Sequence, residues 1–166
     1  LALCPEGIGG KAMKAVLHVN EKPVAVEFDA DDHLLQTLRN HGFTEVKNGC
    51  EEGECGACLV LLNGKPVNSC QVFTATAVND EITTVKGIGT LYKPHIIQDC
   101  FVAAGAVQCG FCTPGMVLAS YALLRDNPNP TEEEIKRALS GNLCRCTGYV
   151  KIIEAVKLAA ERLNKT

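Results

Sequence analysis

The sequence of 166 residues contains no tryptophan, and its aromatic content is only 5%. Proteins that hold nucleic-acid bases commonly stack them on aromatic side chains, so this composition argues against a stacking platform. A basic excess is also missing, because the net charge is -3 and the sequence pI is about 5.8. The basic surface typical of nucleic-acid-binding proteins is therefore excluded, and no nucleic-acid partner is expected.

The sequence also lacks a recognisable export signal. The N-terminal stretch LALCPEGIGGKAMKAVLHVN has no apolar run of the length that a signal peptide needs. The segment Phe101–Leu124 is uncharged over 24 residues, but Gly105, Gln108 and Pro114 interrupt it, and it lacks basic flanks. We therefore expect a cytoplasmic protein without a membrane span.

Cysteine, by contrast, is abundant, with ten residues in the chain. A disulfide scaffold would require an oxidising compartment, whereas cytoplasmic thiols stay reduced and clustered cysteines there more often bind metal. The stretch CEEGECGAC places three cysteines within nine residues. The sequence therefore predicts metal centres rather than disulfides.

The hydrophobic pattern changes near the middle of the chain. After an N-terminal extension, 1–12, the segments KAVLHV and PVAVEF alternate as strands do around the turn NEK, and Asn63–Gly64 is a strong hairpin signal. With a short helix and a further strand in EITTVKG, residues 13–86 are predicted to form an α+β unit. Residues 87–91 are the predicted linker, and 92–166 have the periodicity of helices.

Helix signals predict four helices in the second unit. The segment LYKPHIIQDCFVAAG is predicted to be helical. Thr113 is a predicted cap, with Pro114 at the first helical position, where proline is favoured. Thr131 and Glu134 form a predicted capping box at the start of the next helix, and Gly141 suits a left-handed residue at the end of that helix. A final helix carries an apolar stripe.

Eight of the ten cysteines fall into two sets. The first has the spacing C-x4-C-x2-C-x11-C, which begins like the loop of plant-type ferredoxins. Its loop glycines, Gly49, Gly53 and Gly56, permit positive φ angles and a close approach of backbone N–H groups to sulfur. A zinc site is the alternative, but zinc sites usually pair two short knuckles, so the spacing favours an iron–sulfur cluster. The set consists of Cys50, Cys55, Cys58 and Cys70.

The second set has the spacing C-x2-C, a gap of 31 residues, and C-x-C. A zinc site is a stronger alternative for this set than for the first, because two pairs of cysteines far apart in the sequence can bind zinc. Iron–sulfur is favoured by the tight C-x-C pair, by Arg145 within it, and by the predicted helix start near Pro114, whose N–H groups attract an anion. The set consists of Cys109, Cys112, Cys144 and Cys146.

Three segments together, VKNGCEEGECGACLV, AVQCGFCTPGM and GNLCRCTGY, resemble the iron–sulfur subunit of the molybdenum hydroxylases. This group includes xanthine dehydrogenase, nicotinate dehydrogenase, aldehyde oxidoreductase and aerobic carbon monoxide dehydrogenase. The resemblance covers residues 13–163 and all eight cysteines of the two sets. It implies an α+β fold in which a ferredoxin-like (β-grasp) domain precedes an all-α four-helix domain, each holding one 2Fe–2S cluster. It also implies that Gln108 contacts molybdopterin.

The function that the resemblance implies is electron transfer within a heteromeric enzyme. Electrons from molybdopterin-bound molybdenum in a large partner subunit would pass through the helical-domain cluster and then the ferredoxin-like one. They would reach FAD in another subunit. No catalytic residue is expected in this chain, because its four histidines lie singly. Xanthine, another purine or another N-heterocycle is the expected substrate of the complex, with aldehydes, aromatic thioesters and carbon monoxide as alternatives.

Two other functions are consistent with the cysteine pattern. A free-standing two-cluster ferredoxin would need a strongly acidic docking surface, which a net charge of -3 does not indicate. A zinc-stabilised interaction module would have no redox role. Cys4 and Cys100 lie outside both sets, and we interpret them as a loose thiol and a buried helix residue.

Overall fold

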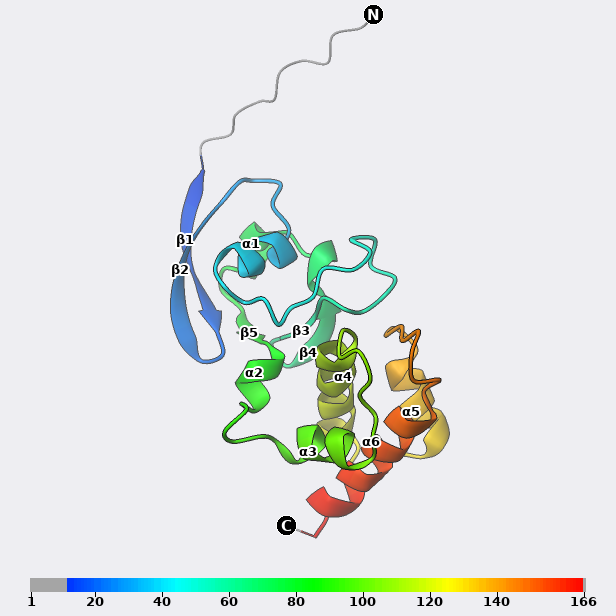
Figure 1. The fold of residues 1–166 in the computed structure, drawn as a ribbon. Coiled ribbons are helices and arrows are strands. Elements are labelled where there is room, and N and C mark those ends of the chain that lie inside the picture. The colour runs from blue at the N-terminus through cyan, green and yellow to red at the C-terminus, as the bar shows by residue number, and fades with distance from the viewer. Residues whose placement is uncertain (1–11, 166) are drawn as a thin grey trace, which may run out of the picture.

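The computed structural model describes residues 12–165, and this range forms an α+β fold with a mixed five-stranded sheet and six α-helices (Figure 1). The strands are β1 Met13–Val19, β2 Lys22–Phe28, β3 Leu59–Leu62, β4 Lys65–Asn68 and β5 Glu81–Thr83. The helices are α1 Leu34–Asn40, α2 Val85–Ile88, α3 Ile96–Ala103, α4 Thr113–Asp126, α5 Glu132–Leu139 and α6 Val150–Leu163. Two short 3-10 helices, η1 Ser69–Gln71 and η2 Thr74–Ala77, lie between β4 and β5.

Two hairpins, one parallel pair (β1 with β5) and one further antiparallel pair (β3 with β5) build the sheet, whose strand order is β2-β1-β5-β3-β4. Asn20 and Glu21 join β1 to β2 with φ angles of 53° and 63°, and Asn63 and Gly64 join β3 to β4 with φ angles of 49° and 79°. Positive φ at both central residues matches the right-handed twist of a hairpin. The two predicted hairpins are confirmed, while β1 and β5 pair in parallel.

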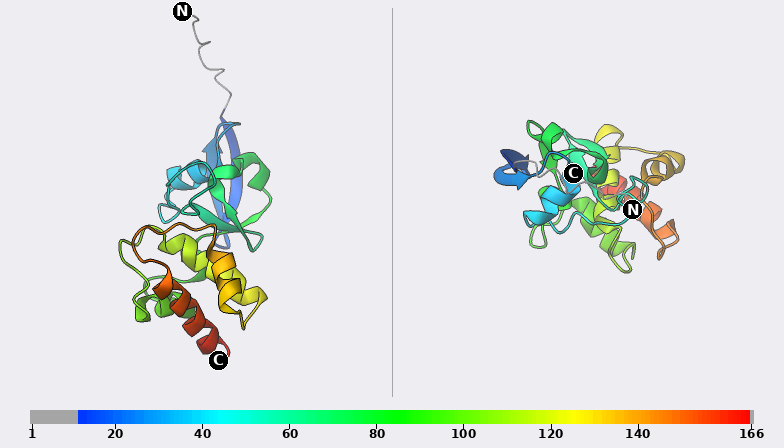
Figure 2. Two further views of the ribbon diagram at one scale, coloured as in Figure 1. Left: turned by 90° about the vertical axis from the view of Figure 1, so that its right-hand side faces the viewer. Right: turned by 90° about the horizontal axis from the view of Figure 1, so that it is seen from above.

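Strand β3 is buried on both faces and separates two hydrophobic clusters. Leu59 and Leu61 face the helical cluster, whereas Val60 belongs to the cluster between the sheet and α1, as expected from the alternation of side chains along a strand. In Figure 1 and in the left view of Figure 2, the helices α3–α6 lie below the sheet. The two faces of the sheet therefore pack against two separate hydrophobic clusters.

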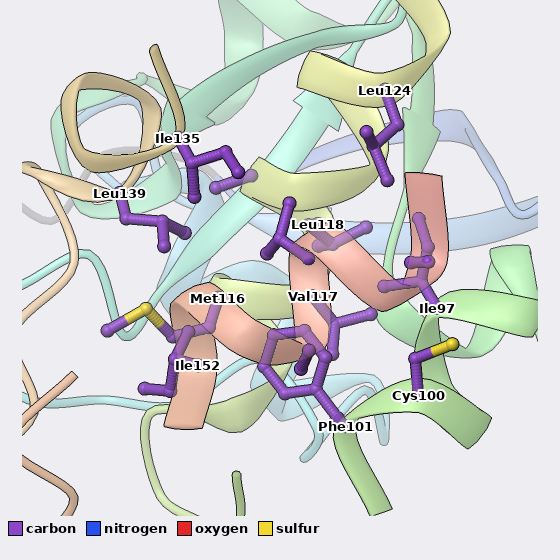
Figure 3. Close-up of a cluster of buried hydrophobic side chains, with 14 of the residues drawn as sticks. Ile97, Cys100, Phe101, Met116, Val117, Leu118, Leu124, Ile135, Leu139 and Ile152 are labelled. Atoms are coloured by element: carbon purple, nitrogen blue, oxygen red, sulfur yellow. The ribbon is translucent and has the colours of Figure 1, made fainter. Parts of the chain in front are cut away.

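The helical cluster is formed around α4, which contacts α3, α5, α6 and β3. Phe101 of α3, Met116 of α4 and Ile152 of α6 are at most 1% exposed and lie together in its centre (Figure 3). Cys100 is fully buried on α3, as predicted, and burial raises the pKa of its thiol. Cys4 lies outside the described residues. No helix within residues 12–165 combines the length and apolarity that a membrane span requires.

Helix termini confirm some of the capping predictions and correct others. The capping box of Thr131 and Glu134 is present at the start of α5. Helix α4 begins one residue earlier than predicted, with Cys112 as its N-cap and Thr113 already helical. Gly141 is not in the left-handed region; α5 ends at Leu139, and its C-cap, Ser140, is in a right-handed conformation. The predicted helix of LYKPHIIQDCFVAAG starts at Ile96, after a turn.

The capping box gives a first prediction. In the Thr131→Ala variant, the Glu134 N–H loses its 3.3 Å acceptor, and the free energy of unfolding should fall by about 1 kcal/mol. Thr131→Ser keeps the hydroxyl and should leave stability close to that of the unchanged protein. Thermal unfolding of the three proteins measures this difference, and equal stability of the Ala variant would contradict the prediction.

Candidate metal centres

The first cysteine set lies in the loop between α1 and β3, with its last member in η1. Backbone N–H groups of Glu52 and Cys55 both donate to Cys50 Sγ at 3.4 Å. The Glu52 N–H, followed by that of Cys55, lowers the pKa of the Cys50 thiol to about 7. These donors favour a charged sulfur at this position.

Cys58 and Cys70 are the buried members of the first set, with 2% and 4% of their surface exposed. Burial, together with the neighbouring Cys70 thiol, raises the pKa of Cys58 to about 11. Gln71 Nε2 lies 3.5 Å from Cys70 Sγ and 3.1 Å from the carbonyl oxygen of Glu51. Gln71 therefore ties the Cys70 side of the set to the loop that carries Cys50.

Loop glycines behave largely as predicted. Gly53 and Gly56 have φ angles of 80° and 66°, in the left-handed region that glycine tolerates best. Gly49 is needed for a different reason, because a Cβ there would lie 2.7 Å from Cys55 Sγ. The bare glycine backbone thus forms one wall of the space around the thiols.

The second cysteine set combines the segment before α4 with the segment before α6. Cys146 Sγ donates to Cys109 Sγ at 3.6 Å, and the N–H of Phe111, followed by this thiol, lowers the pKa of Cys109. Cys112 pairs with Cys144, and burial, reinforced by Cys144, raises the pKa of Cys112 to about 12. Two segments separated by 31 residues are thus brought together as two thiol pairs.

Thr147 is the main donor to the second set. Its Oγ1 lies 3.1 Å and its backbone N 3.4 Å from Cys144 Sγ. Burial alone would raise the pKa of Cys144, but these two hydrogen bonds outweigh it and bring the pKa down to about 7. The Tyr149 hydroxyl accepts the Cys144 N–H at 2.8 Å, which orders the turn around the thiol.

The thiols of both sets are arranged in pairs, with Cys50 beside Cys55 and Cys58 beside Cys70 in the first set, and Cys109 beside Cys146 and Cys112 beside Cys144 in the second. The nine cysteines of the described range are free, and no three His, Cys, Asp or Glu side chains within it gather as ligands of one metal ion would. Four thiolates around two irons, with hydrogen bonds to sulfur, are the ligand chemistry of a 2Fe–2S cluster. The donor sets therefore fit two-iron clusters.

A seam of backbone contacts joins the two sets. The Leu143 N–H donates to the carbonyl oxygen of Cys55 at 2.9 Å, and Asn142 Nδ2 donates to that of Gly56 at 3.0 Å. The loop after α1 therefore lies against the loop that precedes α6, as the cyan and orange segments of Figure 1 show.

Gln108 lies in an exposed loop directly before Cys109. Cys109 and Cys146 are also exposed, in contrast to the buried Cys58 and Cys70. Large apolar side chains near the second set reach solvent, with exposed fractions of 39–75%. They are Val102, Val107, Phe111, Leu143 and Val150.

Sequence reasoning did not identify the polar residues around the thiols. Thr147, Tyr149 and Asn142 lie within the GNLCRCTGY segment, so the motif contained them, but their roles depend on contacts that form only in the fold. Gln71 adjoins Cys70 in the sequence. A position within three residues of a predicted ligand was the available signal for each of these residues.

Comparison with known proteins gives consistent matches. The family model described as "2Fe-2S iron-sulfur cluster binding domain" matches residues 17–84, and "[2Fe-2S] binding domain" matches residues 84–157. The "Nicotinate dehydrogenase small FeS subunit" of Eubacterium barkeri is 51% identical over 147 residues, covering 88% of this chain and 94% of the relative. The "Xanthine dehydrogenase iron-sulfur-binding subunit" of Escherichia coli O157:H7 is 43% identical, covering 83% and 88% respectively.

Among solved structures, the crystal structure of quinoline 2-oxidoreductase from Pseudomonas putida 86 has a chain that matches with a TM-score of 0.88. That chain is 39% identical, and the match covers 93% of this chain and 97% of that one. Together with the paired thiols, these matches define an iron–sulfur protein of the 2Fe–2S type, with two cluster-binding domains.

The chain belongs to the family of iron–sulfur small subunits of the molybdenum hydroxylases. The two relatives named above are iron–sulfur subunits of oxidoreductases, and the chain spans 94% and 88% of their lengths. The family resemblance of the three cysteine segments is thereby confirmed.

Proposed function

We propose that this chain is the electron-transfer subunit of a heteromeric molybdenum hydroxylase. One 2Fe–2S cluster would be bound by Cys50, Cys55, Cys58 and Cys70, and the other by Cys109, Cys112, Cys144 and Cys146. Each cluster supplies one-electron redox chemistry when bound, while the chain orients it and donates hydrogen bonds to its sulfurs. The observation that carries this proposal is the arrangement of both sets as thiol pairs with N–H donors.

We further propose that the two cysteine sets belong to two domains. Residues 13–86 would form the ferredoxin-like (β-grasp) domain, 87–91 the linker and 92–166 the all-α four-helix domain. Two separate clusters of buried side chains support this division. Val85 and Ile88 of α2 pack against the helical cluster, which supports a boundary between the domains close to the proposed linker.

The second set is proposed to face the molybdenum partner. Cys109 and Cys146 are exposed, and Gln108 beside them is accessible for contact with molybdopterin. The exposed apolar side chains nearby would be covered by a large molybdopterin-binding subunit. Electrons would pass from the second set to the first and then to FAD in a further subunit.

For the substrate of the complex we propose an N-heterocycle such as xanthine, another purine or a pyridine carboxylate. The names of several relatives support this class, because they refer to nicotinate, xanthine, nicotine and quinoline. Other relatives act on aldehydes by name, so the assignment depends on the subunit that binds the substrate.

Metal analysis tests the cluster assignment. Two 2Fe–2S clusters would give about four irons and about four acid-labile sulfides per chain, with visible colour in the oxidised protein. A colourless protein with about two zinc ions and no sulfide would instead establish the zinc module. Chelation of iron under reducing conditions should bleach the protein and lower its thermal unfolding temperature, because binding to the folded state stabilises it.

The partner assignment is tested by the size of the native particle. In extract from cells that express the whole enzyme, the chain should elute with two larger polypeptides that carry molybdopterin and FAD. Elution as a small monomer with both clusters present would favour the free-standing ferredoxin.

A further inference from the structure

The seam between the two cysteine sets contains a short connection between proposed ligands of different clusters. Cys55 belongs to the first set, and its carbonyl oxygen accepts the N–H of Leu143 at 2.9 Å. Leu143 directly precedes Cys144 of the second set. One hydrogen bond and the backbone of one residue therefore connect the two ligands. The Leu143 side chain is 56% exposed, so the residue contributes to the seam through its backbone.

Asn142 is the side chain that holds this connection in place. Its amide is buried, with 2% of the residue exposed, and Nδ2 donates to the carbonyl oxygen of Gly56 at 3.0 Å. Gly56 follows Cys55, and Asn142 precedes Leu143, so the two hydrogen bonds run side by side between the same two loops. If the Gly56 carbonyl moved away, the buried amide would be left without an acceptor and without water, which costs free energy. The hydrogen bond therefore resists opening of the seam.

The packing around Asn142 leaves little freedom for the loops. A Cβ on Gly56 would lie 2.6 Å from Asn142 Nδ2, and a Cβ on Gly115 of α4 would lie 2.7 Å from the same atom. The Asn142 carbonyl oxygen also accepts from the Tyr149 hydroxyl, which binds the Cys144 N–H. Asn142 is thus packed between both cysteine loops and the start of α4.

We propose, on the basis of the proposed function, that Asn142 is a positioning residue for electron transfer between the two clusters. Its amide fixes the Gly56 carbonyl and thereby keeps the Cys55 carbonyl hydrogen-bonded to the Leu143 N–H. One electron passes across this link, so the cluster of the second set is oxidised by one electron and that of the first set is reduced by one. Asn142 itself neither binds iron nor changes its charge.

Two substitutions in the assembled complex test the role of the amide. Asn142→Asp keeps the shape of the side chain but replaces the donor with an acceptor that faces the Gly56 carbonyl. Asn142→Ala removes the side chain. In both variants, the magnetic splitting between the two reduced clusters in electron paramagnetic resonance should be lost or reduced. Redistribution of an electron between the clusters after sub-stoichiometric flash reduction should become several-fold slower.

Asn68→Ala is the matched control. Asn68 Nδ2 donates to the carbonyl oxygen of Gly53 at 2.6 Å, so it also fastens the first cysteine loop, but from β4 and through a carbonyl three residues before that of Gly56. This variant should keep the splitting and the rate of the unchanged protein. Iron and sulfide content and thermal unfolding are measured for all four proteins.

The possible outcomes separate this role from a structural one. Full splitting and an unchanged rate in either Asn142 variant would overturn the proposal. Loss of a cluster in both variants would also overturn it, since Asn142 would then be a structural residue. An equal effect of Asn68→Ala would show that the loop as a whole, and not the seam, controls the transfer. Absence of both cluster signals in the unchanged protein would instead contradict the proposed function itself.

Discussion

The Cys112→Ser variant should lose one of the two 2Fe–2S signals and retain the other close to its original form. Cys112 is the N-cap of α4 and pairs with Cys144, so its replacement removes one thiolate from the second set. A serine hydroxyl does not ionise near neutral pH and is a poor substitute for a thiolate ligand. Iron content should fall from about four to about two per chain, and electron paramagnetic resonance after partial reduction should show the remaining signal.

Cys100→Ala provides the matched control for this prediction. Cys100 is fully buried on α3 in the same domain, but it lies outside both thiol sets. Its replacement should reduce stability modestly, by the loss of a buried sulfur, and keep both signals. If Cys112→Ser remained folded but lost both signals, the assignment of one cluster to each set would be wrong.

Local features of the fold were predictable because they depend on residues close together in the chain. The pair Asn63–Gly64 specifies its hairpin through positive φ at both positions, and Thr131 with Glu134 specifies the start of α5. The glycines between the first cysteines indicated a loop whose backbone must approach sulfur. In each case residues fewer than ten positions apart determine the structure.

Features that depend on distant contacts were not predictable in the same way. The segment EITTVKG was expected to be a strand, yet β5 ends at Thr83 and α2 follows at Val85. The reason lies 64 residues away, where Asn20 accepts the Thr84 N–H at 2.8 Å and donates to its hydroxyl at 3.0 Å. A contact between residues so far apart in the sequence cannot be predicted from the local pattern of hydrophobic and polar residues.

The candidate site shows the same division. Spacing predicted the eight cysteines as ligands, because a compact centre requires ligands close together in at least one segment. The pairing of Cys112 with Cys144, and the contact of Asn142 with Gly56 across 86 residues, require the complete fold. The three motifs are therefore recognisable separately, whereas the seam that joins them becomes visible only in three dimensions.

The Gly115→Ala variant should unfold at a lower temperature, although alanine is the better helix former. In an open helix the substitution would stabilise by about 1 kcal/mol. At this position the new Cβ would press against the carbonyl oxygen of Gly56 and lie 2.7 Å from Asn142 Nδ2. A backbone carbonyl cannot rotate away as a flexible side chain can, so α4 and the first cysteine loop must separate. We expect a net loss of about 2 kcal/mol, or roughly 4–8 °C in thermal unfolding.

Gly141→Ala is the matched control, because it changes a glycine in the same region without creating a clash. A Cβ there would meet nothing within 4 Å, and its φ is outside the left-handed region. Alanine should therefore leave stability unchanged or raise it by about 0.4–1 kcal/mol, by restricting the unfolded chain. Equal unfolding temperatures for Gly115→Ala and the unchanged protein would mean that the seam can open at no cost. Because the same contacts hold the Cys55 carbonyl against Leu143, a destabilised Gly115→Ala variant should also show weaker coupling between its clusters.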